Sequence, residues 1–307
     1  MCYAKGISIV TIKDNMVHEI RFTKMQGVGN DFIVLEEPHY PELNWSLLAT
    51  KLCDRRFGIG SDGILLLSRP ESADLRMIML NPDGTYDFCG NGLRCSARYA
   101  LERGMLPMND EKDRYISIAT KAGVRQAIIH ERDVTVGMSV PSFHPKAIPA
   151  LSSEELLDYP LELTDGGVRL TISALSTGSA HAITFTDCLP DDDTFQKISS
   201  QVENHPLFPE RISLMWVKLE DCNHVGIRIW ERGAGETLGC GTGACAVAAE
   251  LFRKNPDCDE VRVSSKGGDL HVKHLVNGEL MMRGPAEFVY DGICHLDLLS
   301  DGSVSFT

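Results

Sequence analysis

The chain has 307 residues, of which 43% are hydrophobic and 24% are charged, and its formal net charge is −13. This length and composition predict a globular protein of one large domain or two ordinary ones. The acidic charge argues against nucleic acid or an anionic membrane as the main partner. Apolar runs stay short of the roughly 18 residues that a membrane-spanning helix needs, so we expect no membrane insertion.

The first residues, MCYAKGISIVTIKDNMVHEI, lack the long apolar stretch of a secretory signal. We therefore expect a cytoplasmic protein in which residues 1–20 are an N-terminal extension, either an extra strand or a disordered lead-in. The ten cysteines are not spaced as in secreted disulfide scaffolds. Most of them are expected to be buried, reduced thiols.

Short apolar segments with a few helical stretches fill the first half of the chain. The predicted strands lie at 21–36 (two strands around a glycine turn), at 62–68, at 75–81 and, as several short ones, at 115–140. The predicted helices lie at 45–58, where Gly58 ends the helix, and at 92–104. The stretch PSFHPKAIPA at 141–150 is typical of a crossing between domains.

The second half follows the same style. Its predicted strands are VRLTISALSTG, SAHAITFT, ISLMWVKLE, HVGIRIWERG and a hairpin-like region at 259–284, and its predicted helices are DTFQKISSQVENH and GTGACAVAAELFRK. Many short strands around one pronounced helix in each half predict an α+β fold with two similar lobes. We expect the N-terminal lobe at 21–143, joined by a C-terminal strand at 286–299, and the C-terminal lobe at 144–285.

One short phrase occurs twice, as CGNGLRC at 89–95 and as CGTGAC at 240–245. Each copy places a cysteine before a glycine, a small polar residue and a second glycine, and then enters a predicted helix. Asn81 precedes Cys89 by eight residues (89 − 81), and Arg232 precedes Cys240 by eight (240 − 232). We interpret the repeat as an internal duplication that gives two facing domains.

A cysteine at the start of a helix lies among backbone N–H groups and at the positive end of the helix dipole. Both favour the thiolate, so we expect the pKa of Cys89 and Cys240 to fall below the usual value of about 8.5. The same N–H groups can bind a carboxylate. Such a pair suits the inversion of a carbon stereocentre, because a thiolate removes the proton on one face and a thiol returns one on the other. A carboxylate held by the helix N-termini would stabilise the developing carbanion.

Other interpretations of the cysteines remain open. Cys95 and Cys245, inside the predicted helices, are expected to be buried packing thiols. A zinc site is disfavoured, because paired C-x-x-C spacing and a histidine at ligand spacing are both missing, so we predict no metal. A disulfide between Cys89 and Cys240 would be an oxidised, inactive form in a reducing compartment.

These residues resemble those of the diaminopimelate epimerase family, cofactor-independent enzymes with two catalytic cysteines. The matching stretches cover nearly the whole chain beyond residue 20; they are KMQGVGNDFIVLE, FGIGSDG, LNPDGTYDFCGNGLRC, STGSAH, FPERISLMWV, ERGAGETLGCGTGACA and VYDG. The resemblance implies two α/β lobes, each a curled mixed sheet around a central helix, with the active site in the cleft between them. It also implies an isomerase without a cofactor that acts in lysine and peptidoglycan biosynthesis.

The resemblance also assigns roles to particular residues. Cys89 and Cys240 match the acid/base pair, and His181 and Glu231 match polar groups that help to set the protonation of the cysteines. Gly90, Asn91, Gly241 and Thr242 match the backbone site for the α-carboxylate. Asn30 matches a substrate-contacting asparagine, and Asn81, Glu231 and Arg232 match residues at the substrate's other end.

Two substitutions set this chain apart from the family pattern. Ser179 and Ser213 stand where the family commonly has asparagines that hold the distal end of diaminopimelate. A serine hydroxyl is shorter than an amide and cannot offer its paired donor and acceptor. Met215 and Trp216 also predict a bulkier and more apolar neighbourhood there.

Three functions therefore remain open. The first is an epimerase that converts LL-diaminopimelate to meso-diaminopimelate. The second is a racemase of a different amino acid on the same scaffold, and the third is a catalytically silent binding or structural protein. The intact cysteine pair favours the two enzymes, and the two serines leave the substrate open. The expected partner is a small amino acid, and the chain is compatible with a homodimer.

Overall fold

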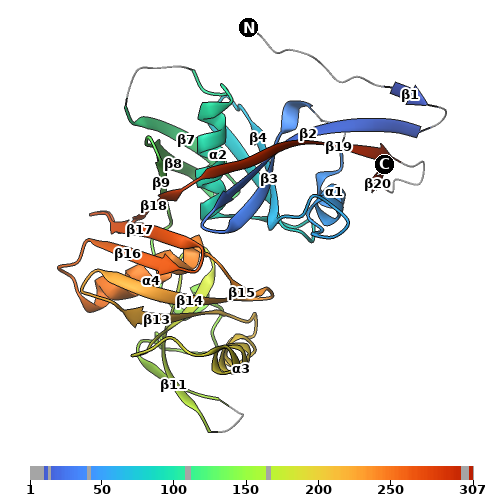
Figure 1. Ribbon diagram of the computed structural model, residues 1–307. Helices are drawn as coiled ribbons and strands as arrows, with labels where there is room; N and C mark the ends of the chain where they lie inside the picture. The colour runs from blue at the N-terminus through green and yellow to red at the C-terminus, as the bar shows by residue number, and fades with distance from the viewer. Residues whose placement is uncertain are drawn as a thin grey trace. The chain divides into compact units, whose positions relative to one another are not determined.

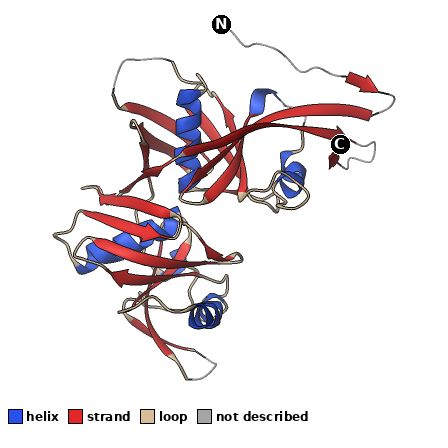
Figure 2. Cartoon of the chain, viewed as in Figure 1, coloured by secondary structure: helices blue, strands red, loops and turns tan. Residues whose placement is uncertain are grey.

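The structure is a computed structural model that describes residues 10–12, 15–39, 43–107, 112–163, 167–298 and 304–306. Strands far outnumber helices in this part of the chain (Figure 2). The chain forms two compact units. The first contains residues up to 26, residues 31–129 and residues from 286 on, and the second contains 27–30 and 130–285.

The first unit is a mixed sheet with two α-helices. Its strands are β1 (Val10–Ile12), β2 (Asn15–Gly27), β3 (Asn30–Glu36), β4 (Gly63–Ser68), β5 (Leu75–Leu80), β6 (Tyr86–Asp87), β7 (Arg114–Thr120), β8 (Gly123–Ile129), β19 (Glu287–Leu298) and β20 (Val304–Phe306). From one edge inward, β19 pairs with β2, followed by β3, β4, β5, β7 and β8. Pairs β3–β4 and β5–β7 are parallel. The helices are α1 (Trp45–Leu52) and α2 (Gly90–Glu102), with a short 3-10 helix at Glu37–His39.

The second unit repeats this plan. Its strands are β9 (Asp133–Gly137), β10 (Tyr159–Glu162), β11 (Arg169–Ser176), β12 (Ala180–Phe185), β13 (Ser213–Leu219), β14 (His224–Glu231), β15 (Gly235–Thr237), β16 (Glu260–Ser265), β17 (Gly268–His274) and β18 (Leu280–Pro285). They pair in the order β10, β11, β12, β13, β14, β16, β17, β18, β9, and β12–β13 and β14–β16 are parallel. The helices are α3 (Asp192–Glu203) and α4 (Gly241–Lys254), with a 3-10 helix at Pro145–Ala147.

The duplication extends to the order and direction of the elements. In both units, a strand leads through a helix to a parallel neighbour, as in β3–α1–β4 and β12–α3–β13. An antiparallel strand and a very short strand then precede the central helix, as in β5–β6–α2 and β14–β15–α4. The next strand returns parallel to the one before the short strand. Each half of the sequence therefore folds into the same supersecondary sequence.

The central helix of each unit is buried on nearly all sides. α4 (orange in Figure 1) contacts β11, β12, β13, β16, β17 and β18, and α2 contacts β4, β5, β7 and β8. Because one helix touches strands from across the sheet, each sheet curls around its helix. Small residues such as Ala244, Ala246 and Ala248 let the strands approach α4 closely. The outer helices α1 and α3 instead bury one face each, with Trp45 and Leu48 in α1 and Phe195 and Val202 in α3.

The α+β fold class is confirmed, and most predicted elements lie within a few residues of their expected positions. The prediction that the first helix extends to Gly58 was wrong, since α1 ends at Leu52. The Asp54 carboxylate accepts hydrogen bonds from the backbone N–H groups of Arg56 and Phe57, both at 2.7 Å, and so forms a turn in place of further helix. β10 was not predicted from the sequence.

The division into units differs from the sequence-based one in two places. Residues 130–143 lie in the second unit, where β9 pairs with β18. Residues 27–30 also count with the second unit, because Val28 packs against the backbone of Gly239 and Gly267. The long strand β19 pairs with β2 and belongs to the first unit. The predicted extension contributes β1 and the start of β2, and residues 1–9 and 13–14 lie outside the described residues.

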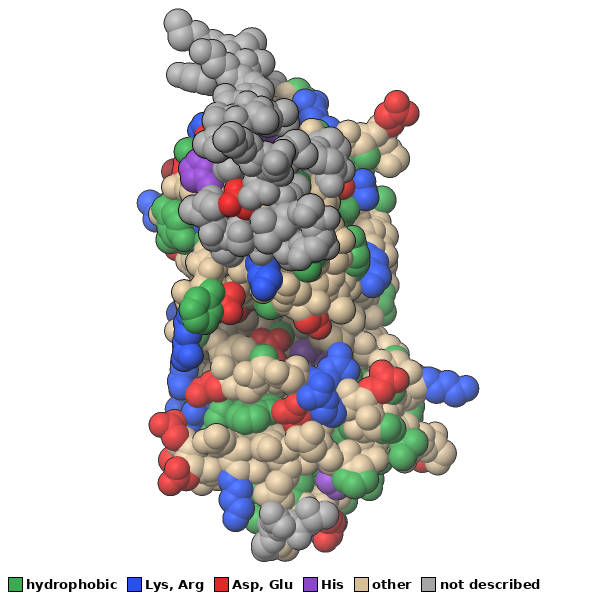
Figure 3. Space-filling view, turned by 90° about the vertical axis from the view of Figure 1, so that its right-hand side faces the viewer, with side chains coloured by type: hydrophobic (Ala, Val, Ile, Leu, Met, Phe, Trp, Pro, Cys, Tyr) green, Lys and Arg blue, Asp and Glu red, His purple; other side chains and the backbone are tan. Residues whose placement is uncertain are grey.

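Charged side chains are mixed on the surface. On the face drawn in Figure 3, acidic and basic side chains are interspersed over the described part of the molecule. Acidic residues exceed basic ones, 43 to 30, in the full sequence. Among the described residues, no helix is both long and apolar enough to cross a membrane.

Candidate active site

Cys89 and Cys240 occupy the same place in their units, immediately before the first residue of the central helix. Both have extended backbones, with φ and ψ of −138° and 117° for Cys89 and −128° and 112° for Cys240. Each sulfur accepts a hydrogen bond of 3.4 Å from a backbone N–H three residues on, that of Gly92 or Gly243. Each cysteine is therefore the N-cap of its helix, a position usually held by an oxygen side chain.

The second glycine of each phrase is required by close packing beneath the cysteine. A Cβ atom on Gly92 would lie 2.9 Å from Leu65 Cδ2, and one on Gly243 would lie 2.7 Å from the sulfur of Met215. Leu65 lies in β4 and Met215 in β13, two residues after the paired positions Gly63 and Ser213 in both strands. The two glycines thus let each helix start settle directly on an equivalent strand.

Cys240 is hydrogen-bonded to a carboxylate. Its sulfur donates to Glu231 Oε2 at 3.0 Å, and the hydroxyl of Thr237 donates to Glu231 Oε1 at 2.6 Å. Glu231 is the last residue of β14, and Thr237 ends β15, which pairs with β14. The hairpin β14–β15 therefore fixes the carboxylate beside the sulfur, where it can accept the thiol proton.

His181 is linked to the Cys240 sulfur through the hydroxyl of Thr242. Its Nε2 lies 3.0 Å from Thr242 Oγ1, which lies 3.5 Å from the sulfur of Cys240. The hydroxyl of Ser179 donates to Thr242 Oγ1 at 3.0 Å and lies 2.8 Å from His181 Nε2. The backbone carbonyl of Thr242 accepts from the hydroxyl of Thr177 at 2.8 Å. Thr177, Ser179, His181 and Thr242 thus meet at the N-terminus of α4, beside Cys240.

Burial dominates the protonation of these groups. It raises the pKa of the Cys240 thiol well above its usual value, and the Glu231 carboxylate raises it further, whereas Thr242 and the Gly243 N–H lower it. Burial also lowers the pKa of His181 to about 3, with a smaller contribution from the positive charge of Arg232. The expected fall in the pKa of Cys240 was therefore wrong, because desolvation and the Glu231 carboxylate outweigh the hydrogen bonds from Thr242 and the Gly243 N–H.

His181 is buried and neutral, and its Nδ1 atom is a buried nitrogen without a hydrogen-bond partner among the described residues. The neutral imidazole has one donor and one acceptor nitrogen. Nε2 faces two hydroxyls, so either tautomer can be satisfied on that side. His181 therefore contributes a neutral group to the site rather than a cation.

Arg232 lies directly after Glu231 and is fixed at both its backbone and its side chain. Its backbone N–H donates to the hydroxyl of Ser213 at 3.1 Å, and its Nη1 donates to the carbonyl of Glu210 at 3.0 Å. Arg232 is exposed, as expected of a residue that meets a ligand from solvent. The two serines thus have different neighbours: Ser213 lies beside Arg232, and Ser179 lies beside Thr242.

The first unit supplies the other predicted residues except Asn30. Cys89 is half-buried, and Asn91 is buried in the first turn of α2. The Asn81 amide donates to Thr85 Oγ1 at 3.1 Å and to Asp87 Oδ2 at 3.3 Å, which fixes it in the turn that precedes β6. Asn30 begins β3 and is counted with the second unit.

Trp216 does not contribute to a bulkier binding site, in contrast to the expectation from the sequence. Its indole Nε1 donates to the hydroxyl of Ser199 in α3 at 2.9 Å, and the ring is buried in the core between β13 and that helix. Met215 points to the opposite face, toward α4. Strand alternation places the two side chains on opposite sides of the sheet.

Two functional candidates were missed in the sequence. Thr237 donates a hydrogen bond to the Glu231 carboxylate. Glu203 accepts hydrogen bonds from Trp230 and Gly233, on either side of Glu231. The GAGET turn after Arg232 could have pointed to Thr237, since a strand that returns beside β14 brings it back to Glu231. Glu203 lies 28 residues before Glu231 (231 − 203) and has no local signal.

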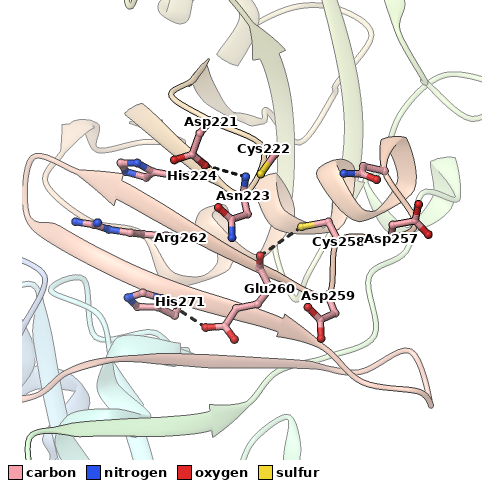
Figure 4. Close-up of a pocket in the computed structure, with 11 residues that line it drawn as sticks. Asp221, Cys222, Asn223, His224, Asp257, Cys258, Asp259, Glu260, Arg262 and His271 are labelled. Carbon is pink, nitrogen blue, oxygen red and sulfur yellow. Dashed lines mark hydrogen bonds and ion pairs between the residues drawn. The ribbon is translucent and has the colours of Figure 1, made fainter.

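A surface depression of the second unit is remote from Cys240. It measures about 650 Å³ and is lined by acidic, cysteine and histidine side chains that include Cys222, Cys258 and His271 (Figure 4). It lies beyond the C-terminal end of α4, while Cys240 caps the N-terminal end, roughly 20 Å away along a 14-residue helix. Across the described residues, no group of three or more His, Cys, Asp or Glu side chains is arranged to hold a metal ion.

Comparison with solved structures defines the class of fold. A hydroxyproline epimerase from Agrobacterium vitis aligns with a TM-score of 0.67 at 16% identity and covers 91% of this chain and 92% of its own. A Bacillus anthracis phenazine biosynthesis protein of the PhzF family aligns with a TM-score of 0.63 at 21% identity, covering 90% and 98%. The chain thus shares its fold with an amino-acid epimerase. In this chain, a hydrogen-bonded cysteine lies at the start of a central helix.

Sequence comparison identifies the family. The diaminopimelate epimerase model matches residues 22–144 and 173–289. The diaminopimelate epimerase of Carboxydothermus hydrogenoformans is 38% identical over 278 residues, which cover 89% of this chain and 98% of the relative. That of Acetivibrio thermocellus is 38% identical over 288 residues, covering 91% and 100%. The chain belongs to the diaminopimelate epimerase family, and the predictions of this family and of an isomerase are confirmed.

Proposed function

We propose that this enzyme inverts the α-carbon of an amino acid with Cys89 and Cys240 as its acid/base pair, and that the amino acid is diaminopimelate. The carrying observation is the Cys240 thiol, which donates to Glu231 at the N-terminus of α4, in a frame that the chain repeats around Cys89. Family membership and the names of the relatives support the substrate.

The proton transfers balance without any further reagent. One cysteine, as thiolate, takes the α-proton and becomes a thiol, and the other, as thiol, gives its proton to the opposite face of the carbanion and becomes a thiolate. Each turnover leaves the former thiolate as a thiol and the former thiol as a thiolate. The next turnover in the same direction therefore requires proton exchange that restores the starting protonation of both cysteines. When Cys240 is the cysteine that has gained the α-proton, Glu231, at 3.0 Å from its sulfur, can accept that proton directly.

The α-carboxylate is assigned to the first backbone N–H groups of α2 and α4, at Gly90, Asn91, Gly241 and Thr242. The first four N–H groups of a helix have no acceptor within the helix, and the dipole favours an anion there. A carboxylate held in this way disperses the charge of the carbanion as the α-proton leaves. Burial of Cys240 and His181 excludes water from that part of the site.

The distal end of the substrate is assigned to Arg232, with Asn81 and Asn30 as further polar contacts. A guanidinium suits a distal carboxylate because its N–H groups match the two oxygens. Ser179 and Ser213, which replace asparagines of the family pattern, lie beside Thr242 and Arg232 and favour the alternative that the amino acid is a different one. That alternative keeps the same cysteine chemistry.

Solvent exchange tests the proposal. Incubation with LL-diaminopimelate in D2O, without pyridoxal phosphate, should place deuterium at the α-carbon of the meso product. A panel of single amino acids, assayed in the same way, distinguishes diaminopimelate from another substrate. Exchange on none of them would refute the enzyme, and exchange on another amino acid alone would replace the substrate.

The enzyme is proposed to act in the cytoplasm, because its mechanism needs two reduced thiols. All nine cysteines within the described ranges are thiols in the structure. A homodimer is proposed through β19, where Phe288, Val289, Tyr290 and Ile293 are 37–55% exposed within six residues. Light scattering of the Tyr290→Asp variant tests this contact, and an unchanged mass would refute it.

A further inference from the structure

We infer that Glu203 is a positioning residue that fixes Arg232, and with it the distal specificity of the enzyme. This inference rests on the proposed function, in which Arg232 binds the substrate's distal carboxylate. Glu203 is the last residue of α3 and is 6% exposed. A carboxylate so far removed from water needs hydrogen-bond donors from the protein.

Three donors converge on the Glu203 carboxylate. The Trp230 indole donates to Oε2 at 2.7 Å, and the backbone N–H of Gly233 and the guanidinium of Arg211 donate to Oε1 at 2.9 Å and 3.0 Å. Trp230 and Gly233 flank Glu231 and Arg232 in the chain. Glu203 therefore holds both ends of the four-residue segment that presents the Cys240 partner and the distal-site cation.

The same carboxylate fixes the segment that contacts Arg232 from the other side. Arg211, which pairs with Glu203, has a positive φ of 61°, a conformation that non-glycine residues seldom adopt. It stands between Glu210, whose carbonyl accepts from the Arg232 guanidinium, and Ser213, whose hydroxyl accepts from the Arg232 backbone. The two residues that accept hydrogen bonds from Arg232, Glu210 and Ser213, thus lie within two residues of Arg211, which Glu203 bonds.

This arrangement gives Glu203 a role beyond folding, because it joins the two segments that contact Arg232. Arg232 is exposed and its side chain has one backbone acceptor, so its position depends on the two segments that Glu203 joins. Trp230 also packs against Phe195, and this ring contact does not depend on the Glu203 carboxylate, so we expect the core to stay packed while the guanidinium moves. The expected consequence is weaker binding of the distal group, while proton transfer at the cysteines continues.

The informative variant is Glu203→Gln. The amide oxygen can keep the bonds from Gly233 and Arg211, but the amide nitrogen then faces the Trp230 indole donor to donor, and the charge opposite Arg211 is lost. We expect KM for LL-diaminopimelate to rise about tenfold, with kcat within about threefold of the wild type. The matched control is Asp193→Asn, an exposed acid changed to its amide in the same helix, which should leave both constants unchanged.

Two double variants show whether Glu203 acts through Arg232. In an Arg232→Ala background, Glu203→Gln should raise KM no further, because the group that it positions is gone. Adding Trp230→Phe to Glu203→Gln removes the opposing donor and should recover part of the lost affinity. Thermal unfolding of all variants measures the fraction that is folded.

The outcomes decide between the possibilities. A KM increase that vanishes in the Arg232→Ala background supports the inference. Unchanged constants, a fall in kcat at constant KM, or an equal KM increase in both backgrounds would overturn it and leave Glu203 a structural residue. Failure of the wild type to epimerise LL-diaminopimelate would instead overturn the proposed substrate, and this inference with it.

Discussion

Helices α2 and α4 begin in the same way but among different side chains. The residue nine positions before the capping cysteine is Leu80 in the first unit and Glu231 in the second (89 − 80 and 240 − 231). The residues that pair across the first parallel ladder are Phe32 and Gly63 in the first unit and His181 and Ser213 in the second. At these equivalent positions the first unit thus has Leu80, Phe32 and Gly63, where the second has Glu231, His181 and Ser213.

This difference shows that the repeat preserves geometry rather than chemistry. Both halves keep the features that set the direction of the sulfur, namely the N-cap conformation and the glycine that packs on the underlying strand. In the second half, the carboxylate of Glu231 lies 3.0 Å from the sulfur, and His181 is linked to that sulfur through Thr242. The two cysteines therefore share a backbone position, and we expect the side chains around Cys240 to make its proton exchange differ from that of Cys89.

Removing either cysteine should have the largest effect. Cys89→Ala and Cys240→Ala should each lower epimerisation by about 10³-fold or more, because each removes the group that acts on one face of the α-carbon. The remaining cysteine can still take a proton and return it to the same face. Deuterium incorporation into recovered substrate should therefore persist for one stereoisomer in each variant, and for opposite ones in the two.

That assay also tests how alike the halves are. If both variants exchanged the same stereoisomer, the cysteines would not act on opposite faces. Near-wild-type epimerisation by either variant would refute the two-base scheme.

Glu231→Gln should have the next largest effect, and on one half only. The amide keeps the shape but cannot accept the thiol proton of Cys240, so exchange of the stereoisomer that Cys240 serves should fall about 10²-fold. Exchange through Cys89, where Leu80 occupies the sequence position equivalent to Glu231, should change by less than about threefold. Stereoisomer-specific exchange measured in D2O gives both numbers.

The matched control is Glu236→Gln, five residues further along the same hairpin, where the carboxylate bonds Arg228 and Lys266 instead of the Cys240 sulfur. It should leave both exchange rates near the wild type. Equal losses for both stereoisomers in Glu231→Gln would show that the two halves share Glu231.

The sequence predicted what is encoded locally. The limits of α4, the capping position of both cysteines and the succession of strands around them follow from apolar periodicity and from the glycine-rich phrases. The place of Arg232 next to Ser213 was also within reach, since the family pattern groups these residues.

Tertiary contacts decided what the sequence did not show. The end of α1 depends on Asp54, whose side chain captures two backbone N–H groups and competes with the helix. The pKa of Cys240 depends on how completely α4 is buried, which periodicity does not measure. Glu203 bonds Trp230 and Gly233 only because α3 ends beside β14.

His181 should make stability depend on pH in a way that the first unit, with Phe32 at the equivalent position, does not. Its pKa is about 3 in the folded state, against about 6.5 when unfolded, because burial disfavours the cation. Between these values the unfolded chain binds a proton that the folded chain does not, so this contribution is complete above about pH 6.5 and is lost as the pH falls. The loss should be about 1.4 kcal/mol per pH unit between about pH 6 and about pH 4.

Urea unfolding across that range, compared between the wild type and His181→Gln, measures the contribution. The variant should show a shallower decline toward low pH, whereas His295→Gln, an exposed histidine in β19, should keep the wild-type slope. Identical slopes for wild type and His181→Gln would mean that His181 is protonated or accessible in the folded enzyme.

The smallest expected effect concerns the two serines, which distinguish the substrates rather than the halves. In Ser213→Asn the amide oxygen can keep the bond from the Arg232 backbone, and the amide nitrogen adds a donor beside the guanidinium. In Ser179→Asn the amide can still donate to Thr242. Each change should raise kcat/KM for LL-diaminopimelate about three- to fivefold, while Ser153→Asn at an exposed position should not. If both variants lost diaminopimelate activity while a different amino acid was turned over faster by the wild type, the serines would be adapted to that amino acid, and the cysteine pair would be the same catalyst with another substrate.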